Sequence, residues 1–173
     1  MNTFALDIWN DEATKCTFYS VKWDGEDENE TDKFLLKYYS DPKYVTPIKR
    51  LRYFIEESIG EDHGPVDVFF NRNENEVKGF PPKGEVRVDE IDYLFIKFPL
   101  RLYALKISEE IVILFNGGIK DGATNQLSSL HNQWVEACQF AKKIIQAFRE
   151  GTIVIDESGR YLVDCNGSNE IVL

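Results

Sequence analysis

Two cations at one end of a predicted β-hairpin suggest an anion-binding site. Residues 98–107 and 111–120 have the pattern of two β-arms, joined by a polar turn at 108–110. Arg101 lies near the start of the first arm and Lys120 at the end of the second, so antiparallel pairing brings them to the same end of the sheet. A guanidinium and an ammonium group placed together can bind phosphate or another anion.

Both cations also have an ordinary structural interpretation. Arg101 could form an ion pair on the sheet surface, where the candidate carboxylates are Glu85, Asp89 and Glu110. Lys120 could be a solvent-exposed loop lysine. The residues alone leave these alternatives open beside the anion site.

A second group of cations lies on a predicted helix at residues 46–60. Its apolar residues recur at helical spacing, and its other face carries Lys49, Arg50 and Arg52. Residues 33–60 hold six Lys and Arg against three Asp and Glu, whereas the whole chain has a net charge of −10. This face is either a local nucleic-acid contact or a solvated basic surface.

The sequence predicts no metal and no cofactor. The acidic stretch at 24–32 lacks the ligand spacing of an EF-hand loop, and Glu61, Asp62 and His63 are adjacent, so they cannot easily converge on one ion. No P-loop, nucleophile elbow or dinucleotide fingerprint is present. The three cysteines are widely scattered, which is typical of reduced thiols.

Charge and hydropathy narrow the class of protein. The net charge of −10 argues against a general nucleic-acid binder, because neutralising phosphates needs clustered Lys and Arg. No apolar run has the length of a membrane helix, and the first ten residues do not have the pattern of a secretory signal. We therefore expect a cytoplasmic protein that is not bound to a membrane.

The elements that must position these residues alternate between strands and helices. Strands are predicted at 4–9, 16–23, 66–70 and in the hairpin; helices at 33–39, 46–60 and 127–150; and a further hairpin at 152–164. In the last helix, apolar residues recur every three or four positions, so that helix should lie on the sheet. The pattern predicts an α+β fold. Residues 1–151 form its body, and residues 152–173 a C-terminal β-hairpin and tail of the same domain.

The hairpin and the helix after it resemble the core of the RelE/ParE toxin superfamily, in particular its HigB-type, phage-related branch. The resemblance rests on Arg-Leu-Tyr-Ala-Leu at 101–105, Ile-Val-Ile-Leu-Phe-Asn-Gly-Gly-Ile-Lys at 111–120 and Ala-Lys-Lys at 141–143. The order helix, helix, hairpin, helix also matches. The similarity spans roughly residues 30–150, with specific residues matching over about 98–148.

This resemblance implies a small twisted, mainly antiparallel sheet packed by two helices from the N-terminal half and one long C-terminal helix. It also implies a metal-independent mRNA endonuclease that acts on the ribosome, and an antitoxin protein as partner. Arg101 matches the strand arginine that the family uses against phosphate, and Lys120 the basic residue that ends the next strand. His131 is a candidate acid or base, since imidazole titrates near neutral pH, or else an ordinary surface histidine.

The chain also departs from the family pattern. Toxins of this family are usually basic and shorter, and here Lys120 is followed by Asp121 and Gly122. Two alternatives to a nuclease therefore stay open. One is a non-catalytic relative that binds a partner protein, and the other is an unrelated α+β domain of phage or mobile-element origin.

Overall fold

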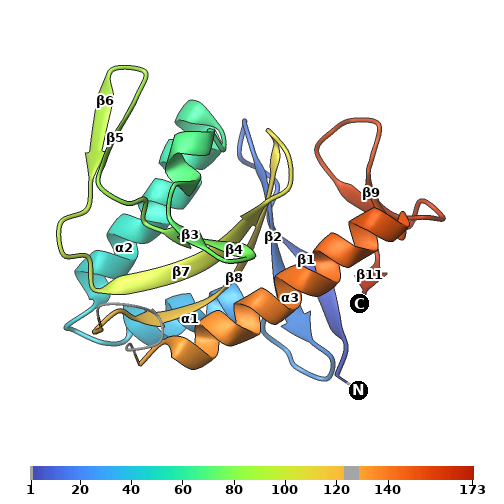
Figure 1. The fold of residues 1–173 in the computed structure, drawn as a ribbon, viewed down its shortest axis with the longest axis horizontal. Coiled ribbons are helices and arrows are strands. Elements are labelled where there is room, and N and C mark those ends of the chain that lie inside the picture. The colour runs from blue at the N-terminus through green and yellow to red at the C-terminus, as the bar shows by residue number, and fades with distance from the viewer. Residues whose placement is uncertain (1, 123–128) are drawn as a thin grey trace.

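The main sheet is mainly antiparallel and joins both halves of the chain. The computed structural model describes residues 2–122 and 129–173. Within them the strands follow the spatial order β11 (Ile171–Val172), β1 (Phe4–Asn10), β2 (Thr17–Trp23), β8 (Ile111–Ile119), β7 (Leu100–Lys106), β4 (Val77–Phe80) and β3 (Asn73–Glu74). Only the β2–β8 pair is parallel among these strands. Figure 1 shows β1 and β2 turned relative to β7 and β8, as expected for a twisted sheet.

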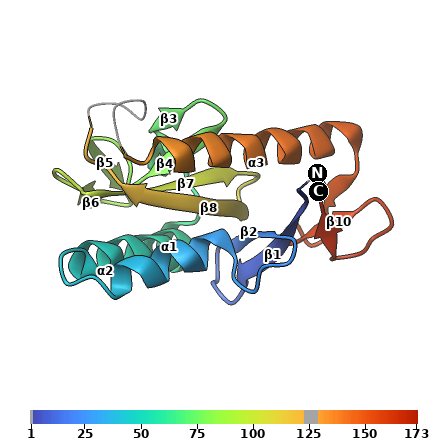
Figure 2. The ribbon, with the colours of Figure 1, turned by 90° about the horizontal axis from the view of Figure 1, so that it is seen from below.

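Helices cover both faces of this sheet. They are α1 (Glu30–Tyr39), α2 (Val45–Tyr53), the π-helical η1 (Phe54–His63), the 3-10 helix η2 (Asp67–Phe70) and α3 (His131–Glu150). Figure 2 shows α1 and α2 on one side of the sheet and α3 on the other. Each side holds its own apolar core. The predicted α+β fold, with two helices from the N-terminal half and one long C-terminal helix, is confirmed. The helix predicted at 127–150 is α3, which begins at His131; residues 127 and 128 lie outside the described residues.

The predicted hairpin forms the centre of the sheet. Strand β8 lies between β2 and β7, and the side chains of residues 111–115 are fully buried. A continuous apolar run is what a strand covered on both faces requires. The pairing shifts register between Leu102 and Ala104, where β8 makes a bulge. At this bulge a Cβ on Gly117 would collide with the carbonyl oxygen of Arg101, so the close approach of the two strands needs glycine.

The helix predicted at 46–60 and the strand predicted at 66–70 differ from the structure. The helix predicted at 46–60 starts earlier, with Tyr44 as its N-cap, and Thr46 lies inside it. It continues through η1 to His63 and ends at Gly64, whose φ of 77° favours glycine. Residues 67–70 form a 3-10 helix and not a strand. There the successive side chains of Phe69 and Phe70 are both buried in one core, which a strand with alternating faces would prevent.

Two small hairpins stand apart from the main sheet. Strands β5 (Glu85–Val88) and β6 (Ile91–Leu94) form an arm that projects from the body in Figure 1. Strands β9 (Ile153–Ile155) and β10 (Leu162–Asp164) form the predicted C-terminal hairpin. The chain then returns to pair β11 with β1, which leaves the two termini side by side (Figure 2).

Candidate anion-binding site

Two arginine side chains converge on the α3 side of the sheet. Arg101 comes from β7, and Arg72 from the turn before β3. A Cβ added to Gly79 on β4 would lie 2.8 Å from Cδ of Arg72 and 2.9 Å from Cδ of Arg101. Both stems therefore pass over the same glycine, which leaves the space that they share. The two charges act on each other, while the guanidinium of Arg72 donates to the backbone carbonyls of Pro81 at 3.1 Å and Pro82 at 3.5 Å.

Arg101 is a buried cation with incomplete pairing. Its exposed fraction is 5%, and its Nη1 lies 3.4 Å from Oε1 of Glu74 on β3. Its Nε is buried and has no hydrogen-bond partner among the described residues. Burial, together with the nearby charge of Arg72, lowers the pKa of Arg101 to about 10. A buried N–H donor without a partner is the group that a bound anion would satisfy.

Lys120 completes the cluster. It follows the end of β8, where its backbone N–H donates to the carbonyl of Pro99 at 2.7 Å. The side chain is half-buried, and burial together with the charge of Arg101 lowers its pKa. The sequence prediction that Arg101 and Lys120 lie at one end of the hairpin is thus confirmed. The two charges are close enough to act on each other.

The first turns of α3 hold the backbone of Glu74, the residue that pairs with Arg101. The indole Nε1 of Trp134 donates to the backbone carbonyl of Glu74 at 3.0 Å, and the thiol of Cys138 lies 3.7 Å from the same oxygen. The ring centre of His131 lies 5.7 Å from that of Trp134. Its Nδ1 is buried and has no hydrogen-bond partner within residues 2–122 and 129–173. The structure therefore places His131 at the start of α3, next to the tryptophan that contacts the backbone of Glu74.

Tyr103 lies under the cluster on the same face of β7. Its side chain is fully buried. Burial and the adjacent Glu74 carboxylate raise the pKa of its hydroxyl. A phenol that resists ionisation can donate a hydrogen bond but is a poor general base. Its part in the site is therefore structural.

The three helix cations lie elsewhere. Lys49, Arg50 and Arg52 belong to α2, which covers the opposite face of the sheet from α3. The guanidinium of Arg50 stacks over the ring of Phe95 at 5.0 Å, and Nε of Arg52 pairs with Glu56 at 2.9 Å. These residues are not part of the Arg101 cluster. Their contacts fit the interpretation as a partly solvated basic surface.

Sequence reasoning missed two members of the cluster. The segment at 71–78 reads as a polar turn, yet it forms the β3–β4 hairpin and delivers Arg72 and Glu74 to Arg101. The carboxylate that pairs with Arg101 is thus none of the three proposed from the sequence. The one local signal is Gly79 beside a charged segment, since a strand glycine often marks a close approach.

No known relative provides a functional assignment. Comparisons with models of protein families, with curated proteins and with solved structures gave no match for this chain.

Among the described residues, no three His, Cys, Asp or Glu side chains form a group that could hold a metal ion. The described helices include none with both the length and the apolar composition of a membrane span.

The geometry supports anion binding. Arg72, Arg101 and Lys120 carry three positive charges, and Glu74 neutralises one of them. The cluster thus has a local excess of positive charge on a protein of net charge −10. Since the cations are partly or wholly buried, their field is screened less by solvent than that of exposed lysines.

Proposed function

We propose that this protein binds RNA phosphate at the Arg72–Arg101–Lys120 cluster and cleaves mRNA in the manner of a RelE/ParE-type toxin. The observation that carries the proposal is the cluster of Arg72, Arg101 and Lys120, whose charges act on one another and on Glu74, with a buried N–H of Arg101 left unpaired among the described residues. The resemblance of the hairpin and α3 to the HigB-type branch supports RNA as the source of the phosphate. An antitoxin protein is the expected partner.

The reaction needs no metal in this proposal. The ribose 2′-oxygen attacks the adjacent phosphorus, a 2′,3′-cyclic phosphate forms and the bond to the 5′-oxygen breaks. One proton leaves the 2′-hydroxyl and one is delivered to the departing 5′-oxygen. Arg72 and Lys120 contact the phosphate oxygens, while Arg101 behind them stabilises the negative charge that grows in the transition state. His131 at the start of α3 is the proposed proton carrier, because its Nδ1 has no hydrogen-bond partner among the described residues.

Inducible expression and a translation assay test this proposal. Expression of the chain in bacteria should arrest growth, and the purified protein should cut mRNA in a reconstituted translation mixture. Arg72→Ala, Arg101→Gln and Lys120→Gln should each lower the cleavage rate by roughly 100-fold, the loss typical of removing one transition-state donor. Arg87→Ala is the matched control, because Arg87 is exposed on the β5–β6 arm and pairs with Asp92. Absence of cleavage by the unaltered chain contradicts the nuclease proposal.

A non-catalytic, protein-binding role is the second candidate. It is favoured by the projecting β5–β6 arm and its surroundings, where large apolar side chains are exposed: Tyr53, Ile91, Leu94 and Ile96. Exposed apolar groups of this kind are typical of protein contacts. If cleavage and growth arrest are absent, capture of a small partner protein that is lost in Tyr53→Ser or Ile96→Ser would support this role.

A further inference from the structure

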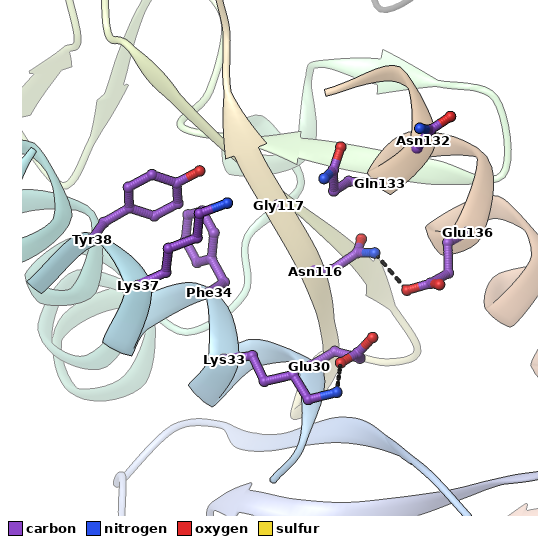
Figure 3. Close-up of a pocket in the computed structure, with 10 residues that line it drawn as sticks. All are labelled: Glu30, Lys33, Phe34, Lys37, Tyr38, Asn116, Gly117, Asn132, Gln133 and Glu136. Atoms are coloured by element: carbon purple, nitrogen blue, oxygen red, sulfur yellow. Dashed lines mark hydrogen bonds and ion pairs between the residues drawn. The ribbon is translucent and has the colours of Figure 1, made fainter. Parts of the chain in front are cut away.

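A pocket separate from the cation cluster opens between α1, β8 and α3. It has a volume of about 260 Å³. Strand β2 pairs with β8 over residues 111–114, and beyond that point the edge of β8 is flanked by the two helices. Figure 3 shows Glu30 and Lys33 reaching in from α1, Gln133 and Glu136 from α3, and Asn116 from the strand between them.

Two carboxyl groups from distant parts of the chain meet in this pocket. Glu30 is buried at the start of α1, and Glu136 lies one turn into α3. Burial, together with a hydrogen bond and the like charge from Glu136, raises the pKa of Glu30 to about 7. The pair therefore holds a shared proton in weakly acidic solution and tends to lose it above neutral pH.

The pocket also has hydrogen-bond acceptors without donors. Asn116 is 9% exposed, and its Nδ2 donates to Oε1 of Glu136 at 2.8 Å. Its own Oδ1 is buried and finds no partner in the described part of the chain, and the same holds for Oε1 of Gln133. A buried amide oxygen without a donor costs free energy of roughly 1–3 kcal/mol, which a ligand donor would recover.

The two lysines that line the pocket already have partners. Nζ of Lys33 pairs with Glu30 at 2.9 Å and also contacts the carboxylate of Glu26. Nζ of Lys37 lies 5.6 Å from the ring centre of Tyr38. The remaining polar groups that line the pocket are carboxyls, amides and the hydroxyl of Tyr38, and two of the amide oxygens have no donor among the described residues.

We propose that this pocket binds the primary ammonium group of a small organic amine. An ammonium group offers three N–H donors and one positive charge. These match the two amide oxygens and the carboxyl pair, which gives up its shared proton when the cation binds. The proposal is independent of RNA cleavage, since none of the pocket residues belongs to the Arg101 cluster.

Calorimetry on the full chain tests the proposal with 1,4-diaminobutane as the probe and 1,4-butanediol as its uncharged analogue. The diamine should bind and the diol should not. Glu136→Gln and Gln133→Leu should each weaken binding of the diamine at least about tenfold, which is the effect of losing one charge-assisted hydrogen bond. Glu150→Gln is the matched control, because Glu150 lies on α3 at its far end, exposed and outside the pocket.

The pH dependence of the same titration gives a second readout. The titratable groups that line the pocket are Glu30, Lys33, Lys37 and Tyr38 from α1 and Glu136 from α3. Burial raises the pKa of Tyr38, so its hydroxyl stays protonated between pH 6 and 8. Over this range the diamine affinity of the unaltered chain should rise as the carboxyl pair loses its proton. Glu30→Gln should remove most of the rise.

Three results would overturn the proposal. The first is that the diamine and the diol bind equally well, or that neither of them binds. The second is an unchanged diamine affinity in Glu136→Gln and Gln133→Leu, with circular dichroism showing that both variants are folded. The third is much tighter binding of Nα-acetyl-lysine amide than of the diamine, which would assign the pocket to a lysine side chain of another polypeptide.

Discussion

Burial and incomplete pairing with Glu74 determine how the Arg101 side chain can bind a ligand. Desolvation disfavours its charge, and the ion pair with Glu74 at 3.4 Å leaves the buried Nε without a partner among the described residues. Its depressed pKa of about 10 still keeps it charged at neutral pH. A ligand therefore meets a permanent positive charge behind the more accessible Arg72 and Lys120.

The carboxyl pair predicts a pH-dependent stability at the residue scale. The folded state holds the proton of Glu30 more tightly than the unfolded chain, so this group stabilises the fold below pH 4.5, and the contribution is lost as pH rises toward 7. Glu30→Gln cannot titrate. Its free energy of unfolding relative to the unaltered chain should therefore increase by roughly 1–3 kcal/mol between pH 5 and pH 8.

Urea unfolding at the two pH values measures this difference. Glu28→Gln is the control, since Glu28 is exposed in the loop before α1 and should show no such trend. A difference between Glu30→Gln and the unaltered chain that stays constant with pH would contradict the shifted pKa.

Gly117 carries a second prediction at this scale. Gly117→Ala should lower the free energy of unfolding by about 2–4 kcal/mol, because the new Cβ meets the backbone of Arg101 and Leu102, which cannot move aside easily. Gly118→Ala should lower the free energy of unfolding by less, because its new Cβ meets a side-chain atom of Leu130 at 3.2 Å and no backbone atom. Chemical denaturation of both variants measures the difference, and an equal loss would argue against a close strand approach at Gly117.

At the scale of elements, the β5–β6 arm depends on one histidine. His63 ends η1, and its ring is almost fully buried. Its Nδ1 lies 2.7 Å from Oδ2 of Asp89 in the turn of the arm, and its Nε2 lies 2.8 Å from the hydroxyl of Tyr93 on β6. The histidine thus joins a small, separate sheet to the helical layer.

Tyr93→Phe should loosen this arm. The substitution removes one hydrogen bond to His63, worth about 1 kcal/mol, and keeps the aromatic packing. Amide hydrogen exchange in residues 85–94 should become several-fold faster, while exchange in β7 and β8 stays the same. Asp89→Asn is the control, because asparagine tolerates the positive φ of 48° and can still hydrogen-bond the histidine. Unchanged exchange in Tyr93→Phe would mean that the arm is held by apolar contacts instead.

On the scale of the whole molecule, the net charge of −10 opposes the binding of nucleic acid except at the cation cluster. Three phosphate contacts at most are then expected. Each phosphate contact with a single strand contributes roughly −0.7 to the slope of log binding constant against log salt concentration. A plot of these two quantities for RNA should therefore have a slope of about −2. Fluorescence anisotropy with a short single-stranded RNA at several salt concentrations measures the slope. A slope near −5 would indicate that other cations, such as those of α2, also bind the backbone.

The local sequence determined much of the fold. The continuous apolar run at 111–115 predicted a central strand, and the three- and four-residue recurrence after 127 predicted the long helix, because periodicity reports which side of an element is covered. The same reasoning failed at 66–70, where the run of apolar residues carries no period and the packing of two phenylalanines selects a 3-10 turn.

The sites were decided by the tertiary structure. The sequence placed Arg101 and Lys120 together, because they flank a single hairpin, yet it gave no sign that Arg72 and Glu74 join them. Likewise Glu30 and Glu136 are far apart in the chain and meet only because α1 and α3 flank the same end of β8. Contacts within a hairpin follow from local pairing. Contacts between elements depend on sheet order and helix packing, which local patterns do not encode.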